Sequence, residues 1–259
     1  MFEWFKKKDR LAEERVFKTV QYEFNDAKPI ADFFKITTGI NFEDQMSILK
    51  SKLTSFCKLR EIANFESCLL QLKNNQELNQ ELNNYLTTNE TYFYREFGQI
   101  EALVDKVRIE KKLADILCIP CSTGEEPYSI AIALLEAGVD QNKFNIVGID
   151  INTEAIERAL EGIYNKRDVS RMPGDLIEKY FTPNNDKYFI KQKIKDMVKF
   201  RSYNLFNEDI EELGRFDFIV SRNMFIYFDL ETKKRAALIL QKILKNSESC
   251  IFYGHADLY

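Results

Sequence analysis

Histidine is nearly absent from this chain of 259 residues, which contains only His255. One histidine excludes a metal site built from several histidines, and it leaves a serine or cysteine triad with a single candidate base. The five cysteines are an odd number scattered along the chain, so we expect reduced thiols rather than a disulfide framework. Cys118 and Cys121 form a C-x-x-C with no second pair of cysteines or histidines beside it. We therefore expect these two thiols to pack in the interior, and we expect no metal site.

The chain also lacks strong positive charge and long apolar runs. Its formal net charge of -4 gives no support for nucleic-acid binding, which normally shows as a strongly basic patch. No apolar run approaches the roughly 18 residues that a membrane span needs. Residues 1–8 lack the order of a secretory signal. We therefore expect a cytoplasmic protein with neither a nucleic-acid partner nor membrane insertion.

Apolar residues in the first third of the chain recur at helical spacing, and no strand pattern is visible before residue 87. The clearest series is Met46, Leu49, Leu53, Phe56 and Leu59. A chain of this length is comfortable for two domains. We therefore predict a helical N-terminal domain over residues 1–88 and a second domain over residues 89–259.

The helix predicted around residues 42–62 is locally basic. Its basic side chains are Lys50, Lys52, Lys58 and Arg60. At about 100° per residue they spread around the helix axis. The pattern suits a solvated helix at least as well as a surface for an acidic partner.

Residues 87–97 (TTNETYFYREF) separate the helical part from the second domain. Thr87-x-x-Glu90 fits a capping box, which predicts a helix that begins within this stretch and runs on through Tyr92, Phe93, Arg95, Ile100 and Leu103. Its aromatic residues are expected in the core. On this segment alone, Arg95 reads as a solvated or salt-bridged helix charge.

From Leu113 onward, strand patterns alternate with helix patterns. The expected strands are residues 113–121, 144–150, 216–221 and 250–253, and the expected helices are residues 126–138, 153–162 and 232–245. This order predicts an α/β fold with a parallel, doubly wound sheet. Residues 164–203 interrupt the alternation, and residues 188–190 with 197–200 suit a small antiparallel excursion.

The turn at residues 121–129 (CSTGEEPYS) has the place of a nucleotide-binding corner. With one glycine, Gly124, and two carboxylates it would repel a triphosphate. Asp150 ends the next strand, where an acidic side chain accepts hydrogen bonds from ribose hydroxyls. An adenosyl sulfonium ligand fits these demands better than a dinucleotide does. The alternative is that Asp150 only caps the following helix.

Four sequence blocks make a specific resemblance. They are TTNETYFYRE, CSTGEEPYSIAI, GIDINTEAIERALEGIY and FDFIVSRNMFIYFD, with TGINFEDQ and FESCLLQL before them. In this order the chain resembles the CheR family of chemotaxis receptor methyltransferases. The resemblance implies a class I methyltransferase domain with an inserted β-subdomain, at about residues 181–200, behind a small helical domain. It also implies methyl transfer from S-adenosyl-L-methionine to glutamate side chains on the cytoplasmic helical bundle of chemoreceptors, with S-adenosyl-L-homocysteine as product.

The resemblance assigns roles to residues within the blocks. The residues expected to bind the cofactor are Asn89, Thr91, Arg95, Glu126, Asp150, Asn204, Leu205, Arg222 and Asn223. Arg95 and Tyr227 are expected to flank the transferred methyl group as the catalytic residues. A carboxylate acceptor is already ionised at neutral pH, so the transfer needs no strong general base. Without the resemblance, Asn204, Arg222 and Tyr227 read as ordinary strand-end and loop polarity.

Two departures from the family pattern shape the functional hypothesis. The excursion at residues 181–200 lacks the longer glycine-containing loop that grips a receptor's C-terminal pentapeptide, so we expect no tethering. The chain stops at GHADLY, and the strand that ends near Tyr253 is expected to be an exposed sheet edge. Two alternatives stay open: a non-catalytic module that binds receptors, and a class I methyltransferase acting on a small molecule or another protein.

Overall fold

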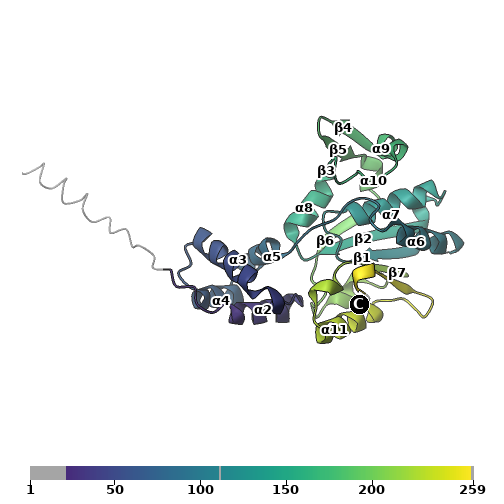
Figure 1. The fold of residues 1–259 in the computed structure, drawn as a ribbon. Coiled ribbons are helices and arrows are strands. Elements are labelled where there is room, and N and C mark those ends of the chain that lie inside the picture. The colour runs from purple at the N-terminus through teal and green to yellow at the C-terminus, as the bar shows by residue number, and fades with distance from the viewer. Residues whose placement is uncertain (1–21, 111, 258–259) are drawn as a thin grey trace, which may run out of the picture.

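The computed structural model describes residues 22–110 and 112–257 (Figure 1). The beginning of the predicted N-terminal domain, including residues 1–8, lies outside these ranges. Among the described residues, no helix is long and apolar enough to cross a bilayer.

Residues 22–86 are mainly helical, as predicted, and have an apolar core of their own. Their helices are α2 (Lys28–Thr38), η1 (Glu43–Gln45), α3 (Met46–Leu59), α4 (Phe65–Asn74) and α5 (Gln76–Leu86). The side chains of Phe34, Leu53 and Phe56 are completely buried in this core. Asn64 and Asn75 cap α4 and α5 by accepting backbone N–H bonds. We call this part of the chain the helical region.

The stretch 87–97 does not begin a helix where the capping box predicted. The next helix, α6 (Phe97–Ile109), starts only at the end of the stretch and has no side-chain cap. Thr87 instead ends α5, because its hydroxyl donates to a carbonyl in the last turn of that helix at 2.7 Å. Tyr94 and Glu96 have left-handed backbones, with φ of 60° and 48°. The prediction was wrong because contacts with the rest of the molecule, rather than local capping, set this backbone.

Five parallel strands form the central sheet, in the order β6-β2-β1-β7-β8. The strands are β1 (Ala114–Cys118), β2 (Phe144–Asp150), β6 (Val198–Ser202), β7 (Phe218–Ser221) and β8 (Cys250–Tyr253). The predicted parallel sheet is confirmed. β8 lies at the edge, and all four of its residues are partly exposed, as expected for the strand that ends near Tyr253.

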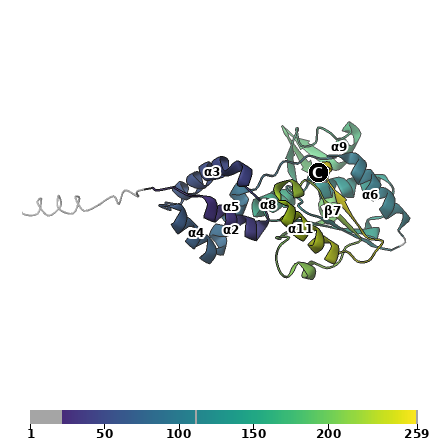
Figure 2. The same cartoon turned by 60° about the horizontal axis from the view of Figure 1, so that its bottom comes forward.

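Helices cover both faces of this sheet, so it is doubly wound (Figures 1 and 2). Neighbouring residues of β1 alternate between the two faces: Ile116 packs in the core that contains α6 and α7, and Leu117 in the core that contains α11. The remaining helices are α7 (Glu125–Glu136), η2 (Gln141–Lys143), α8 (Thr153–Glu161), η3 (Ile210–Leu213), η4 (Phe225–Tyr227), α11 (Leu230–Lys242) and η5 (His255–Asp257).

A small antiparallel sheet projects from the main sheet, but it is built differently from the prediction. Its strands β3 (Ile163–Asn165), β5 (Lys187–Ile190) and β4 (Phe181–Asn184) pair in that order, beside the helices α9 (Gly174–Tyr180) and α10 (Gln192–Lys195). Pairing of residues 188–190 with 197–200 was wrong, because β6 joins the main sheet beside β2. Tyr164 and Phe181 instead bury their rings against Phe93, with ring centres 4.7 and 5.1 Å away.

A polar seam joins the helical region to the loop that follows β2. The Asn84 side chain accepts the backbone N–H of Thr153 at 2.9 Å and donates to its hydroxyl at 2.8 Å. Asn152 donates to the Thr87 hydroxyl at 2.8 Å, and Gln80 donates to the Ile151 carbonyl at 2.8 Å. The seam therefore fixes α5 against the start of α8, which begins three residues beyond Asp150.

Replacing Asn84 with Ala should lower the free energy of unfolding by about 1–3 kcal/mol, because the Thr153 N–H is left without its partner at a partly buried place. Urea denaturation measures the change. Asn74→Ala is the matched control, since the Asn74 side chain donates only to the Leu70 carbonyl on an exposed surface. Equal losses in the two variants would show that the seam adds no stability of its own.

Candidate functional site

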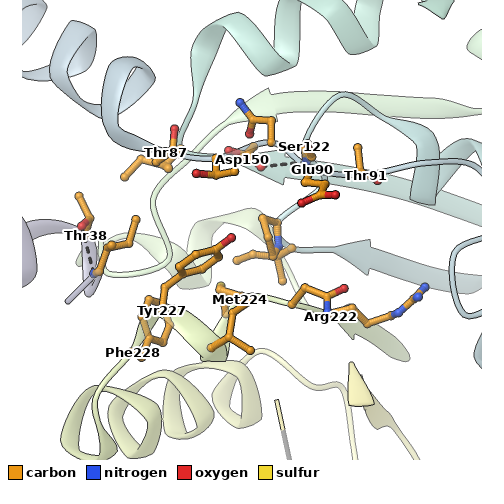
Figure 3. Close-up of a pocket in the computed structure, with 18 of the residues that line it drawn as sticks. Thr38, Thr87, Glu90, Thr91, Ser122, Asp150, Arg222, Met224, Tyr227 and Phe228 are labelled. Atoms are coloured by element: carbon orange, nitrogen blue, oxygen red, sulfur yellow. Dashed lines mark hydrogen bonds between the residues drawn. The ribbon is translucent and has the colours of Figure 1, made fainter. Parts of the chain in front are cut away.

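A cavity of about 540 Å³ lies at the carboxyl ends of β1, β2 and β7, the usual ligand position in an open α/β sheet (Figure 3). It brings together every residue that the sequence nominated for the site. These are Asn89, Thr91, Arg95, Glu126, Asp150, Asn204, Leu205, Arg222, Asn223 and Tyr227. They come from parts of the chain more than 100 residues apart.

The corner between β1 and α7 depends on Gly124. This residue precedes α7 with φ of 94°, and a Cβ atom placed on it would lie 2.9 Å from the Ala159 Cβ. Only glycine allows both the left-handed backbone and the close approach of α8. The tight turn places Glu126 in the first turn of α7, facing the cavity.

Asp150 stands at the end of β2 with only 5% of its surface exposed. Its carboxylate accepts the backbone N–H of Ser122 at 2.8 Å and that of Asn152 at 2.9 Å. Burial raises the pKa of Asp150 to about 6, although these backbone bonds oppose the rise. Figure 3 shows Asp150 and Ser122 side by side on one wall of the cavity. The carboxylate is therefore held in a fixed position with lone pairs left to accept more hydrogen bonds.

Glu126 and Arg222 form a buried ion pair. The Arg222 Nη1 lies 2.8 Å from the Glu126 Oε2, and the Arg222 side chain is 2% exposed. Its Nη2 donates to the Arg95 carbonyl at 2.6 Å. Burial raises the pKa of Glu126 to about 7, with Arg222 and Arg95 opposing the rise. The Glu126 Oε1 is buried without a partner, which leaves one carboxylate oxygen available to a cationic or hydrogen-bonding ligand.

Arg95 and Tyr227 lie nearer to solvent. The Arg95 side chain donates to the Glu90 carbonyl at 2.9 Å. Tyr227 is 39% exposed, and Figure 3 shows its ring reaching into the cavity between Asp150 and Met224. Burial raises the pKa of the Tyr227 hydroxyl, while the Arg95 charge lowers it. The hydroxyl is therefore protonated at neutral pH and can donate a hydrogen bond.

Asn204 has a structural task that the sequence did not predict. Its side-chain N–H donates to the Thr37 carbonyl at 2.7 Å, and its oxygen accepts the Phe206 N–H at 2.9 Å. The side chain thereby ties the loop after β6 to α2. Leu205, the next residue, is buried in the cavity wall.

The helical region supplies a wall of the cavity that sequence reasoning did not identify. Its lining residues are Thr38, Ile40, Asn41, Phe42, Asp44, Gln45, Ile48, Lys52 and Leu86. The Asn41 N–H also donates to the Tyr227 carbonyl at 2.8 Å. Most of these residues belong to the block TGINFEDQ, which carried part of the resemblance and was the one available signal.

The four basic residues of the helical region do not act as one group. Arg60 is bound to Glu81, with its Nε 2.6 Å from Oε2, and it stacks over the Phe56 ring at 3.8 Å. It therefore fastens α3 to α5. Lys52 lies at the cavity, whereas Lys50 and Lys58 are exposed.

Replacing Asp150 with Ala should weaken binding of the S-adenosyl ligand that the sequence predicts by about 1–3 kcal/mol, because its hydroxyls lose a charged acceptor. In the unchanged protein, affinity should fall from pH 8 to pH 5, since Asp150 and Glu126, with pKa values of about 6 and about 7, take up protons and lose their charge. Calorimetry with S-adenosylhomocysteine measures both effects. Asp140→Ala is the control, because that exposed carboxylate only accepts the Asn142 N–H. Unchanged affinity in a folded Asp150 variant would remove this residue from the site.

Comparison with known proteins gives one consistent result. A family model described as "CheR methyltransferase, SAM binding domain" matches residues 89–258. The chain is 38% identical over 231 residues to a chemotaxis protein methyltransferase of Campylobacter jejuni, which covers 88% of this chain and 87% of that protein. It is 35% identical over 240 residues to chemotaxis protein methyltransferase 2 of Vibrio cholerae, and this alignment covers 87% of this chain and 83% of that protein.

The match extends beyond the sheet into the helical region, because these relatives cover more of the chain than the family model does. The four blocks that suggested the resemblance lie inside or at the border of the matched residues 89–258. The chain belongs to the CheR methyltransferase family.

Proposed function

We propose that this chain methylates glutamate side chains on the cytoplasmic helical bundle of chemoreceptors, and that it does so in the cytoplasm. Family membership makes it a methyltransferase that uses S-adenosylmethionine, and its relatives are named for chemotaxis. The acceptor and the place of action are the proposal. The observation that carries it is one cavity that is lined by the carboxylates of Asp150, which is buried, and Glu126, which is 14% exposed, together with the more exposed Arg95 and Tyr227.

The residues present fit S-adenosylmethionine. Asp150 offers a fixed carboxylate for the ribose hydroxyls, and the unpartnered Oε1 of Glu126 suits the ammonium of the methionine part. Arg222 serves this contact indirectly, because its guanidinium holds the other oxygen of Glu126. The wall that completes the proposed binding site consists of Asn89, Thr91, Asn204, Leu205 and Asn223.

The chemistry asks mainly for positioning. When bound, S-adenosylmethionine supplies a methyl group on a positively charged sulfur. A glutamate side chain is already ionised at neutral pH, so the chain need not remove a proton from it. In this proposal Arg95 receives the acceptor carboxylate through a forked contact, which also favours the ionised form. Tyr227 donates from a protonated hydroxyl and orients the acceptor or the methyl group.

Recruitment of the receptor is proposed to rely on the helical region rather than on a tether. β4 and β5 are joined by a turn of only Asn185 and Asp186, so the hairpin has no long loop to hold a peptide. Lys52 lies at the cavity, with Lys50 and Lys58 on the same helix. Acidic surfaces of a receptor helix would be attracted to this side of the mouth.

The deciding experiment is incubation with methyl-labelled S-adenosylmethionine and receptor cytoplasmic fragments, with and without their C-terminal tails. We expect base-labile methyl esters on glutamate and equal rates for the two fragments. Label on other acceptors alone would favour a different substrate. Binding to receptors without any label transfer would favour a non-catalytic module. Tight binding to an isolated tail peptide would contradict the absence of a tether.

Replacing Tyr227 with Phe should lower kcat about 10- to 100-fold, because a hydrogen bond to a charged group is lost, and should change S-adenosylhomocysteine affinity much less. Steady-state kinetics and calorimetry separate the two effects. Tyr85→Phe is a matched control, since Tyr85 is 38% exposed, close to the 39% of Tyr227, and lies on α5 away from the cavity. Equal losses of turnover and affinity would make Tyr227 a packing residue.

Replacing Lys50, Lys52 and Lys58 together with Ala should raise KM for the receptor fragment and leave S-adenosylhomocysteine affinity intact. In the unchanged protein the methylation rate should fall as ionic strength rises, because charges are screened over about 8 Å at physiological salt. Arg60 is left in place because it stabilises the fold.

The matched control for this triple variant removes the same charge elsewhere. Lys106, Lys143 and Lys193 are exposed and do not line the cavity. If the two triple variants methylate receptors equally well, the helical region does not recruit the receptor through these lysines.

A further inference from the structure

The GHAD turn, residues 254–257, follows β8 and does not line the cavity. In the sequence it stood out only as the site of the single histidine, which had no evident partner. In the structure the turn lies against the loop that leaves β7, residues 222–227. That loop, here the β7 loop, carries Arg222, Asn223 and Tyr227.

Asp257 makes the central contact between the GHAD turn and the β7 loop. Its Oδ2 accepts the backbone N–H of Asn223 at 2.5 Å and that of Gly254 at 3.0 Å. The residue is only 7% exposed. Burial raises the pKa of Asp257, and the backbone amides of Asn223, Gly254, Ile226 and Phe225 oppose that rise. Its Oδ2 thus joins the backbone of the β7 loop, at Asn223, to the backbone of its own turn, at Gly254.

The turn has the shape that this contact requires. A Cβ atom on Gly254 would lie 2.8 Å from the Asp257 Oδ2 and 2.9 Å from the Asn223 nitrogen. Asn223 has φ of 59°, in the left-handed region that asparagine adopts more readily than most other non-glycine residues. A carboxylate bonded to its N–H fixes that backbone.

The other side of the turn contacts the segment that carries Arg95. His255 Nδ1 lies 3.0 Å from the Glu96 Oε2 and 3.3 Å from the Gln99 Nε2. The same Glu96 oxygen lies 3.6 Å from the Arg222 Nη2. The GHAD turn therefore bridges the two segments that carry Arg95 and Tyr227.

We propose that Asp257 is a positioning residue for this methyltransferase. Its carboxylate holds the β7 loop in the conformation that directs Asn223 and Tyr227 into the cavity, and it does so without touching cofactor or acceptor. The part of this inference that concerns turnover rests on the proposed role of Tyr227. The part that concerns cofactor affinity rests on the position of Asn223 and Met224 in the cavity wall.

The test compares Asp257→Ala with Asp257→Asn in the full chain, by calorimetry with S-adenosylhomocysteine and by kinetics with receptor fragments. Misplacing reacting groups by about 1 Å can cost about 100-fold, so we expect D257A to lose about 30- to 100-fold in kcat and to bind S-adenosylhomocysteine about tenfold more weakly. KM for the receptor fragment should stay within about twofold, because Asp257 does not face the acceptor. D257N keeps an oxygen at the place of Oδ2 and should recover part of both losses.

Asp217→Ala is the control for loss of stability. Asp217 also accepts a backbone N–H, that of Asp115, at 2.7 Å, and it forms an ion pair with Lys245 at 2.6 Å. These contacts lie at the opposite end of the sheet. D217A should lower the melting temperature and leave kcat and affinity unchanged.

Three results would overturn the inference. The first is a folded D257A whose kcat and S-adenosylhomocysteine affinity stay within about threefold of the unchanged protein. The second is a loss of kcat and affinity in D217A equal to that in D257A. The third is a D257N that recovers neither kcat nor affinity. The affinity measurement needs no methyl acceptor. It therefore decides the positioning role of Asp257 even if the unchanged protein fails to methylate receptors and the proposed function falls.

Discussion

The buried guanidinium of Arg222 is the contact on which the site depends most. It joins the Glu126 carboxylate on α7 to the Arg95 carbonyl, 127 residues away in the chain, and its own backbone continues β7. Leaving one partner of a buried ion pair uncompensated costs about 3–5 kcal/mol. The pair is therefore weak evidence for net stability but strong evidence for a fixed geometry. Three parts of the cavity wall, the start of α7, the segment with Arg95 and the end of β7, meet at the Arg222 side chain, which fixes their relative positions.

The sequence predicted those parts of the fold that local periodicity controls. β2 and β8 were predicted with their observed bounds, and the helices α7, α8 and α11 within a few residues. Prediction failed where distant contacts decide the backbone. Residues 87–97 include good capping residues, yet Thr87 ends α5 and the next helix, α6, begins only at Phe97. Residues 197–200 were assigned to the small sheet because strand patterns do not reveal the partner strand, but residues 198–202 form β6 and pair with β2.

Site residues were predictable where short motifs follow strand ends, because parallel strands bring those ends to one edge of the sheet. Asp150 and Arg222 are examples. Residues whose task is to hold other residues carried no such signal. The Asn204 side chain lines the cavity and is also bonded to the Thr37 carbonyl, and Arg60 reads as part of a basic surface but is bonded to Glu81. No motif in the sequence marks Asp257, because its contact with the site is a hydrogen bond from the N–H of Asn223, 34 positions earlier.

The shared wall of the cavity has a thermodynamic consequence. The helical region lines the cavity together with the sheet domain, and the Asn41 N–H donates to the Tyr227 carbonyl at 2.8 Å, so the cavity exists in full only while the two parts of the chain stay packed together. A ligand that binds only when the helical region is packed against the sheet, here the closed arrangement, stabilises that arrangement by linkage. The gain is about 2.7 kcal/mol when the free ligand concentration is a hundred times the dissociation constant. Local opening between the helical region and the sheet is then suppressed when cofactor is plentiful. The same coupling means that helical-region substitutions far from the ligand can change cofactor affinity through the population of the open arrangement alone.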